Sequence, residues 1–134
     1  LESVLRRRPR ILLAEDSVAS IEITLAYLEA ACCDVHVVQN GERAVLAAIE
    51  WRPDLILMDI QMPLVDGIEA TQRIRALADP ALANVPIVAL TALAMHGDRE
   101  RCLDAGADDY VSKPFKLADL GNTVSRWLQA AAAA

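Results

Sequence analysis

Leu55-Ile-Leu-Met-Asp59 places four consecutive apolar residues directly before a carboxylate. A short strand that is apolar on both faces is typical of a parallel sheet with helices covering each side. Further apolar runs of strand length occur along the chain, and amphipathic stretches of helical period separate them. We therefore predict a doubly wound α/β fold whose strands lie at Ile11–Ala14, Val35–Val38, Leu55–Met58, Ile87–Leu90 and Tyr110–Ser112.

The intervening helices are predicted from their capping residues and their apolar positions. Ser17 and Asn40 are suitable N-cap residues, and Gly106 is suited to end a helix. The sequence from Asp66 to Glu69 resembles a capping box. We expect helices from Ser17 to about Cys32, from Asn40 to Trp51 (with Ala44, Val45, Ala48 and Ile49 facing inward), from Asp66 to about Ala78, from about Met95 to Ala105 and from about Leu117 to Gln129.

Length and composition fit a single domain. A chain of 134 residues, 54% of them hydrophobic, can bury one core but is too short for two ordinary domains. The net charge of −6 argues against binding to a nucleic-acid backbone, and no apolar run approaches the roughly 18 residues that cross a bilayer. We expect a cytoplasmic domain at residues 10–130 without direct nucleic-acid or membrane contact, preceded by a linker or N-terminal extension at 1–9 and followed by a C-terminal tail at 131–134.

The cysteines and histidines indicate neither a metal site nor a disulfide. Cys32, Cys33 and Cys102 lack metal-ligand spacing, and an odd number fits a disulfide framework poorly, so we expect buried or half-buried free thiols. His36 and His96 are expected to be structural or surface residues.

Polar residues stand at the carboxyl ends of the predicted strands: Glu15 and Asp16, Asp59, Thr91, and Lys113. Ligands of such sheets bind at this edge. Carboxylates that converge there repel one another unless their pKa values rise or a cation binds, and an oxygen-only ligand set suits Mg²⁺ better than zinc or copper. A lysine and a hydroxyl supply the charge and the hydrogen-bond donor that a phosphoryl group needs. Each residue alone is explained as a turn, a cap or a surface charge, but their conjunction predicts a site.

The chain resembles the receiver domains of two-component signalling over roughly Arg10 to Gln129. The stretches that carry the resemblance are Ile11-Leu-Leu-Ala-Glu-Asp16, Met58-Asp-Ile-Gln-Met-Pro-Leu-Val-Asp-Gly67, Val88-Ala-Leu-Thr-Ala92 and Ala105-Gly-Ala-Asp-Asp-Tyr-Val-Ser-Lys-Pro-Phe115. The resemblance implies a flavodoxin-like sheet with strand order 2-1-3-4-5 and helices on both faces. Among receivers the chain looks most like those attached to hybrid sensor histidine kinases, and a free-standing response regulator is the alternative.

The resemblance also implies a role for each site residue. Asp59 is expected to be the phosphoacceptor, with Asp16 ligating Mg²⁺ directly and Glu15 acting through a metal-bound water. The Asp59 carboxylate and the backbone carbonyl of Gln61 are expected to complete the protein's share of the coordination. Lys113 is expected to pair with the phosphoryl group, and its bond to the following proline is expected to be cis.

A switch is implied as well. Thr91 is expected to bond the phosphoryl group and Tyr110 to turn inward after it. This movement changes the surface formed by the last two predicted helices and the last strand, where a downstream partner protein is expected to bind. The phosphoryl donor is expected to be a histidine kinase or a histidine phosphotransfer domain. We hypothesise that Gln61 orients the water that hydrolyses the acyl phosphate while Leu93 hinders it, which gives an intermediate lifetime.

Competing interpretations are a receiver that serves only as a phosphorylation-independent docking module, an enzyme with an aspartyl-phosphate intermediate, and a flavin-binding protein. The complete set of site residues argues against the first. The second needs another catalytic aspartate soon after the nucleophile, but Ile60 and Gln61 follow Asp59. The third needs a phosphate-binding loop where acidic residues stand. Whether the chain counts as an enzyme stays open, because a receiver assists its own phosphorylation and dephosphorylation.

Overall fold

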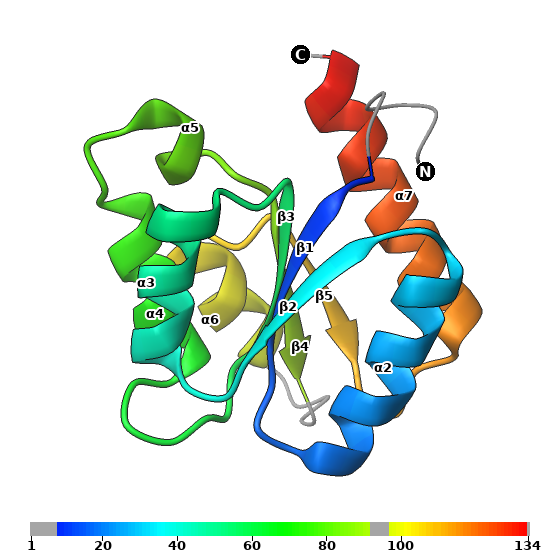
Figure 1. Cartoon of the computed structure of the whole chain (residues 1–134). Helices are drawn as coiled ribbons and strands as arrows, with labels where there is room; N and C mark the ends of the chain where they lie inside the picture. Colours follow the sequence, from blue (N-terminus) through cyan, green and yellow to red (C-terminus); the bar gives the residue numbers. More distant parts are fainter. Residues whose placement is uncertain (1–7, 92–96, 134) are drawn as a thin grey trace.

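The computed structural model describes residues 8–91 and 97–133. Within these ranges five parallel strands form one sheet in the order β2-β1-β3-β4-β5 (Figure 1). This confirms the predicted fold class and strand order. Each strand is one residue longer than predicted: β1 (Arg10–Ala14), β2 (Asp34–Val38), β3 (Leu55–Asp59), β4 (Ile87–Thr91) and β5 (Asp109–Ser112).

Helices cover both faces of the sheet, as predicted. The helices α2 and α7 lie on one face, and α3, α4 and α6 lie on the other (Figure 1). The described helices are α2 (Val18–Ala30), α3 (Gly41–Trp51), α4 (Gly67–Arg75), α5 (Pro80–Ala83), α6 (Asp98–Ala105) and α7 (Leu117–Ala133). None of them is long and apolar enough to cross a membrane.

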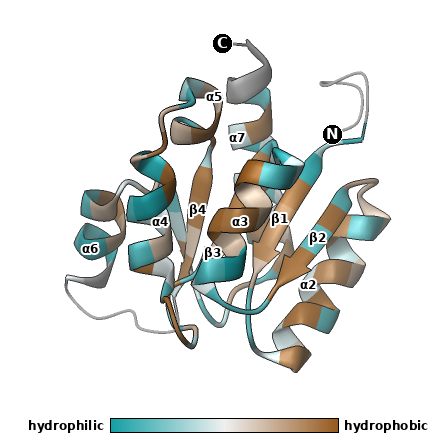
Figure 2. Ribbon diagram, turned by 60° about the vertical axis from the view of Figure 1, so that its left-hand side comes forward, coloured by the Kyte–Doolittle hydropathy of each residue, from teal (hydrophilic) through white to brown (hydrophobic). Residues whose placement is uncertain are grey.

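The core consists of two layers because neighbouring strand residues point to opposite faces. Ile11 and Leu13 pack with Leu120 of α7 in one layer. Leu12 and Ala14 pack in the other layer against α3 and α4. Burial of each large aliphatic side chain contributes roughly 1.5–3 kcal/mol, and hydrophobic residues dominate the strands between the more polar helices (Figure 2). The strands are therefore held in place on both sides, which fixes the edge where their carboxyl ends meet.

The predicted N-caps are present at three helices. Asn40 Oδ1 accepts a hydrogen bond from the Arg43 amide at 2.8 Å, and Ser17 Oγ accepts one from the Ser20 amide at 3.4 Å. Asp66 Oδ1 accepts one from the Glu69 amide at 2.9 Å. The Glu69 carboxylate forms an ion pair with Arg73 at 2.8 Å. Asp66 is thus a cap, as predicted, while the Glu69 side chain stabilises the helix surface.

Several local features differ from the prediction, and among them α7 continues to Ala133 instead of ending near Gln129. The helix α4 ends at Arg75 rather than near Ala78. The short helix α5 follows it, capped by Asp79 and begun by Pro80, and four residues are too few for a helical period to be recognised. Ile49 is 42% exposed rather than facing inward. The expected start of the next helix near Met95 lies outside the described residues, and α6 begins at Asp98.

Candidate functional site

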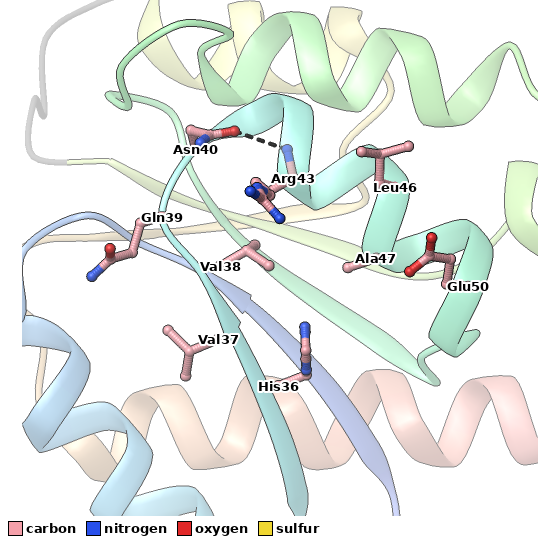
Figure 3. Close-up of a pocket in the computed structure, with 9 residues that line it drawn as sticks. All are labelled: His36, Val37, Val38, Gln39, Asn40, Arg43, Leu46, Ala47 and Glu50. Atoms are coloured by element: carbon pink, nitrogen blue, oxygen red, sulfur yellow. Dashed lines mark hydrogen bonds between the residues drawn. The ribbon is translucent and has the colours of Figure 1, made fainter.

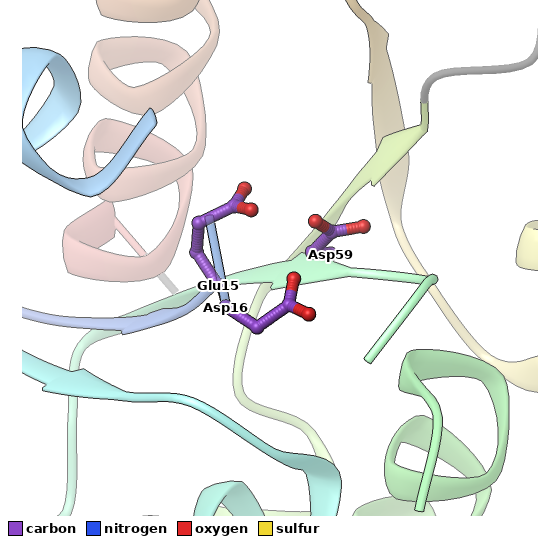
Figure 4. Close-up of side chains that lie close together, drawn as sticks. All are labelled: Glu15, Asp16 and Asp59. Atoms are coloured by element: carbon purple, nitrogen blue, oxygen red, sulfur yellow. The ribbon is translucent and has the colours of Figure 1, made fainter. Parts of the chain in front are cut away.

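Three carboxylates meet at the carboxyl edge of the sheet. Glu15 and Asp16 follow β1, and Asp59 is the last residue of β3, the strand that pairs with β1. One oxygen from each of the three lies within 4.8 Å of the others, and the side chains gather around one point (Figure 4). Glu15 is 1% exposed and Asp59 6%, whereas Asp16 is exposed. The cluster therefore combines two buried charges with one that is open to solvent.

Lys113 brings a positive charge into this cluster. Its Nζ lies 2.5 Å from Glu15 Oε2 and 3.1 Å from Asp59 Oδ2. The residue follows β5, and its backbone amide donates to the carbonyl of Thr91 at 2.6 Å. The Lys113–Pro114 peptide bond is cis, which confirms the prediction. Parallel pairing thus brings residues 54 positions apart in the sequence into direct contact.

Thr91 stands at the same edge. It is the last residue of β4 and is 1% exposed. Its neighbour Leu90 is in register with Asp59 across the β3–β4 pair, so Thr91 lies one position further toward the open edge. The structure therefore gathers Glu15, Asp16, Asp59, Thr91 and Lys113 at one edge.

Burial and neighbouring charges perturb two groups in the site. Burial raises the pKa of Glu15, and the hydrogen bond with Asp59 raises it further, while the bond from Lys113 opposes both. Burial alone would lower the pKa of Lys113, but its contacts with Glu15 and Asp59 outweigh burial and raise it. One ammonium against three carboxylates leaves a net charge of −2 when all are ionised. An oxygen-only cluster of this charge fits a hard divalent cation such as Mg²⁺.

Gln61 is placed beside the cluster. Its backbone amide donates to Asp59 Oδ1 at 2.9 Å, so both oxygens of the Asp59 carboxylate are fixed in position. Asp16 and Gln61 both line a hollow of about 440 Å³ next to the site. Leu93, the second residue expected to tune hydrolysis, lies outside the described residues.

The model of the response regulator receiver domain family matches residues 11–125. The chain belongs to this family. All five residues gathered at the edge of the sheet lie inside the matched segment.

This receiver domain is similar to proteins of different overall size. It is 40% identical over 122 residues to the sensor protein GacS of Pseudomonas syringae, and this covers 90% of the chain but 14% of GacS. It is 36% identical over 118 residues to the polar-differentiation response regulator DivK of Brucella anthropi, covering 88% of the chain and 94% of DivK. The chain thus spans a small part of a sensor kinase and nearly all of a free-standing regulator.

A solved structure gives a further comparison. The receiver domain of sensor histidine kinase PA1611 from Pseudomonas aeruginosa is 44% identical, with a TM-score of 0.84 over 90% of this chain and 98% of that one. That crystal structure has a magnesium ion coordinated in its active-site cleft.

Two contacts around the site of this receiver were not recognised from the sequence. A β-carbon on Gly67 would overlap the carbonyl oxygen of Asp59 and approach Ile60 Cα to 2.7 Å. The Gly67 amide also donates to the Ile60 carbonyl at 3.2 Å. The start of α4 therefore packs directly on the backbone of Asp59, whereas the sequence indicated Gly67 only as part of the capping box from Asp66 to Glu69. The Ser17 amide in turn donates to Glu15 at 3.1 Å.

A separate hollow of about 480 Å³ lies between the edge strand β2 and α3 (Figure 3). It is lined by His36, Val37, Val38, Gln39, Asn40, Arg43, Leu46, Ala47 and Glu50, and none of the predicted site residues takes part. The ring of His36 lies against that of Trp51, tilted by 39° with the centroids 5.5 Å apart, which agrees with a structural role. None of the three cysteines forms a disulfide, as predicted; Cys33 and Cys102 are buried, but Cys32 is exposed where a buried or half-buried thiol was expected.

Proposed function

We propose that this receiver domain accepts a phosphoryl group onto Asp59 from a phosphohistidine of a histidine kinase or histidine phosphotransfer domain. The observation that carries the proposal is that the Asp59 carboxylate belongs to an acidic cluster and also contacts the amine of Lys113. An acidic cluster can hold a cation, and an amine beside it can neutralise phosphoryl oxygens. Both are what the transfer of a phosphoryl group to a carboxylate requires.

The transfer is a nucleophilic displacement at phosphorus. An oxygen of Asp59 attacks, an O–P bond forms, and the N–P bond to histidine breaks, with its electron pair returning to the imidazole nitrogen. The hydrogen bond from the Gln61 amide keeps the carboxylate from turning. Lys113 pairs with the transferred group, and the hydroxyl of Thr91 donates a hydrogen bond to a phosphoryl oxygen. Orientation and charge neutralisation are therefore the main contributions of the protein.

Mg²⁺ fits the residues present. Asp16 and Asp59 would bind it directly, Glu15 would act through a bound water, and the backbone carbonyl of Gln61 would complete the set. When bound, the cation supplies positive charge that neutralises the phosphoryl oxygens during transfer. The net charge of the cluster and the exposed carboxylate of Asp16 support this assignment. The magnesium ion in the PA1611 receiver supports it independently.

The output is proposed to be a change in the α6, β5 and α7 surface, to which a downstream partner protein binds. Thr91 moves toward the phosphoryl group and Tyr110 turns inward after it. The register supports this route, since Tyr110 pairs with Ala89, which is two residues before Thr91 on the same face of β4. The rate at which water removes the phosphoryl group is set by Gln61, which orients the water, and by Leu93, which hinders it.

The proposal extends to the parent protein. We infer that residues 10–130 form the receiver unit, with linker or extension at 1–9 and tail at 131–134, and that it works in the cytoplasm, where histidine kinases present their phosphohistidine. GacS and DivK support a hybrid kinase and a free-standing regulator, respectively. The second candidate function is a docking module of receiver fold that does not use phosphate.

Phosphorylation by a small donor tests the proposal. The protein is incubated with Mg²⁺ and acetyl phosphate, and its intact mass is measured beside Asp59→Asn and Asp16→Asn. The parent should gain one phosphoryl group, Asp59→Asn should gain none, and Asp16→Asn should gain it far more slowly because the cation is lost. A parent that neither gains the group nor binds Mg²⁺ would favour the docking module instead.

A further inference from the structure

Arg99 lies over the ring of Tyr110. Its Cζ is 5.5 Å from the ring centroid, a distance at which the cation and the aromatic face attract each other. Arg99 belongs to the first turn of α6, and Tyr110 belongs to β5. The contact therefore joins two of the three elements of the proposed output surface.

Tyr110 occupies a position that is not fully enclosed. Its side chain is partly buried and packs against the core layer under α3, α4 and α6. The residue in register with it on β4 is Ala89, whose methyl group cannot hold a tyrosine ring in place. Arg99 thus supplies a specific contact to the Tyr110 ring, which Ala89 of β4 does not.

We propose that Arg99 is a positioning residue that holds Tyr110 in the arrangement described here and thereby sets how readily this domain adopts its phosphorylated packing. The inference rests on the proposed function, because it assumes that Tyr110 turns inward. In the present arrangement Lys113 bonds directly to the Asp59 carboxylate, and the Arg99–Tyr110 contact exists together with that bond. An inward turn of the ring takes it away from the guanidinium, so the contact stabilises one packing and not the other.

The size of the effect follows from the strength of the contact. A cation–π pair at a solvent-exposed site changes an equilibrium by about two- to fivefold. By linkage, whatever stabilises the unphosphorylated packing weakens the binding of a phosphoryl mimic by the same factor. Loss of Arg99 should therefore strengthen that binding about two- to fivefold.

Simple electrostatics predicts the opposite sign. Arg99 is a cation, and removing a cation from a protein weakens its attraction for an anion. An exposed arginine that has only this general effect should give slightly weaker binding when it is replaced. The direction of the change therefore separates a positioning role from a general charge effect.

The test is the dissociation constant of beryllofluoride, a mimic of the phosphoryl group, measured by calorimetry on the whole chain in saturating Mg²⁺. Arg99→Ala should bind it about two- to fivefold more tightly than the parent. Arg99→Lys, which keeps the charge but loses the planar group that stacks on the ring, should fall between them. Arg43→Ala, which removes an exposed arginine from α3, is the matched control and should not bind more tightly.

A double-mutant cycle with Tyr110→Ala shows whether Arg99 acts through the ring. In that background Arg99→Ala should not tighten binding, because only the general charge effect of the arginine is left. Unchanged or weaker binding by Arg99→Ala in the parent background would overturn the inference, as would a gain that persists without the tyrosine. If the parent itself binds no beryllofluoride, the proposed function fails and this inference fails with it. A parent that binds while Arg99→Ala shows no gain refutes the positioning role alone.

Discussion

Arg75→Met should destabilise the domain, because the Arg75 side chain binds several distant segments. Nε of Arg75 donates to the Gly106 carbonyl at 2.7 Å, and Nη1 donates to the carbonyls of Ala83 and Val85 at 2.9 and 2.7 Å. Nη2 pairs with Asp108 at 2.8 Å. One side chain thus joins the end of α4 to the end of α5, the segment before β4 and the turn between α6 and β5.

The expected loss in free energy of unfolding is smaller than the sum of the contributions of these hydrogen bonds. A hydrogen bond to a charged group contributes about 1.5–3 kcal/mol, and a carbonyl left without a partner has a cost when water cannot reach it. The side chain of Arg75 is 19% exposed and that of Asp108 is 33% exposed, so water replaces part of what is lost. We expect about 3 kcal/mol, which is the lower end for breaking a buried pair. In a domain of this size the melting temperature should fall by roughly 9 °C.

Arg73 provides a matched control two residues earlier in α4. Its side chain is 49% exposed and pairs with Glu69 one turn away, a contact that contributes about 0.3–0.5 kcal/mol. Urea unfolding of the parent, Arg75→Met and Arg73→Met gives the three free energies of unfolding. If Arg75→Met loses less than about 1 kcal/mol, or no more than Arg73→Met, the assignment of Arg75 as a structural link is refuted.

Three predictions concern the site itself. Burial raises the pKa of Glu15 in the folded state above its value in the unfolded chain. The protonated side chain therefore contributes its full stability at a pH below the unfolded-state pKa, and this contribution is lost as the pH rises through the folded-state pKa. Glu15→Gln without metal should therefore gain more stability over the parent at about pH 7 than at about pH 4 in urea unfolding. Gly67→Ala should cost about 1–3 kcal/mol and slow phosphorylation, because its methyl group displaces the Asp59 backbone. Lys113→Met should bind Mg²⁺ about tenfold more tightly by titration, yet gain the phosphoryl group more slowly.

The sheet and most of the site could be predicted because their signals are local. The three central strands β1, β3 and β4 are apolar on both faces, and the polar residues that end or follow them are adjacent in the sequence. Parallel strands bring those ends to one edge, so Asp59, Thr91 and Lys113 could be placed together without knowing any distance. The N-caps at Ser17, Asn40 and Asp66 were equally accessible, since each depends on a residue three positions away.

Contacts between distant segments could not be predicted in this way. The partners of Arg75 lie 8 to 33 positions later, and nothing in the residues between them specifies a common meeting point. The contact between Arg99 and Tyr110 needs the packing of α6 on β5 to be known. Gly67 was visible in the sequence only as part of the expected capping box, because its closeness to the Asp59 carbonyl depends on how α4 docks. The helix α5 was too short for a periodic pattern to indicate it.

Charge balance connects the separate features of the site. Three carboxylates and Lys113 leave a net charge of −2, which a divalent cation brings to zero. The proposed phosphorylation would replace the Asp59 carboxylate by a group that carries about two negative charges, so the balance would become negative again. Lys113 already contacts both Glu15 and Asp59, so it can leave one carboxylate for the new oxygens without crossing the site. In the proposed function the remaining excess of negative charge draws a further donor toward Asp59, and Thr91 lies next along the same edge.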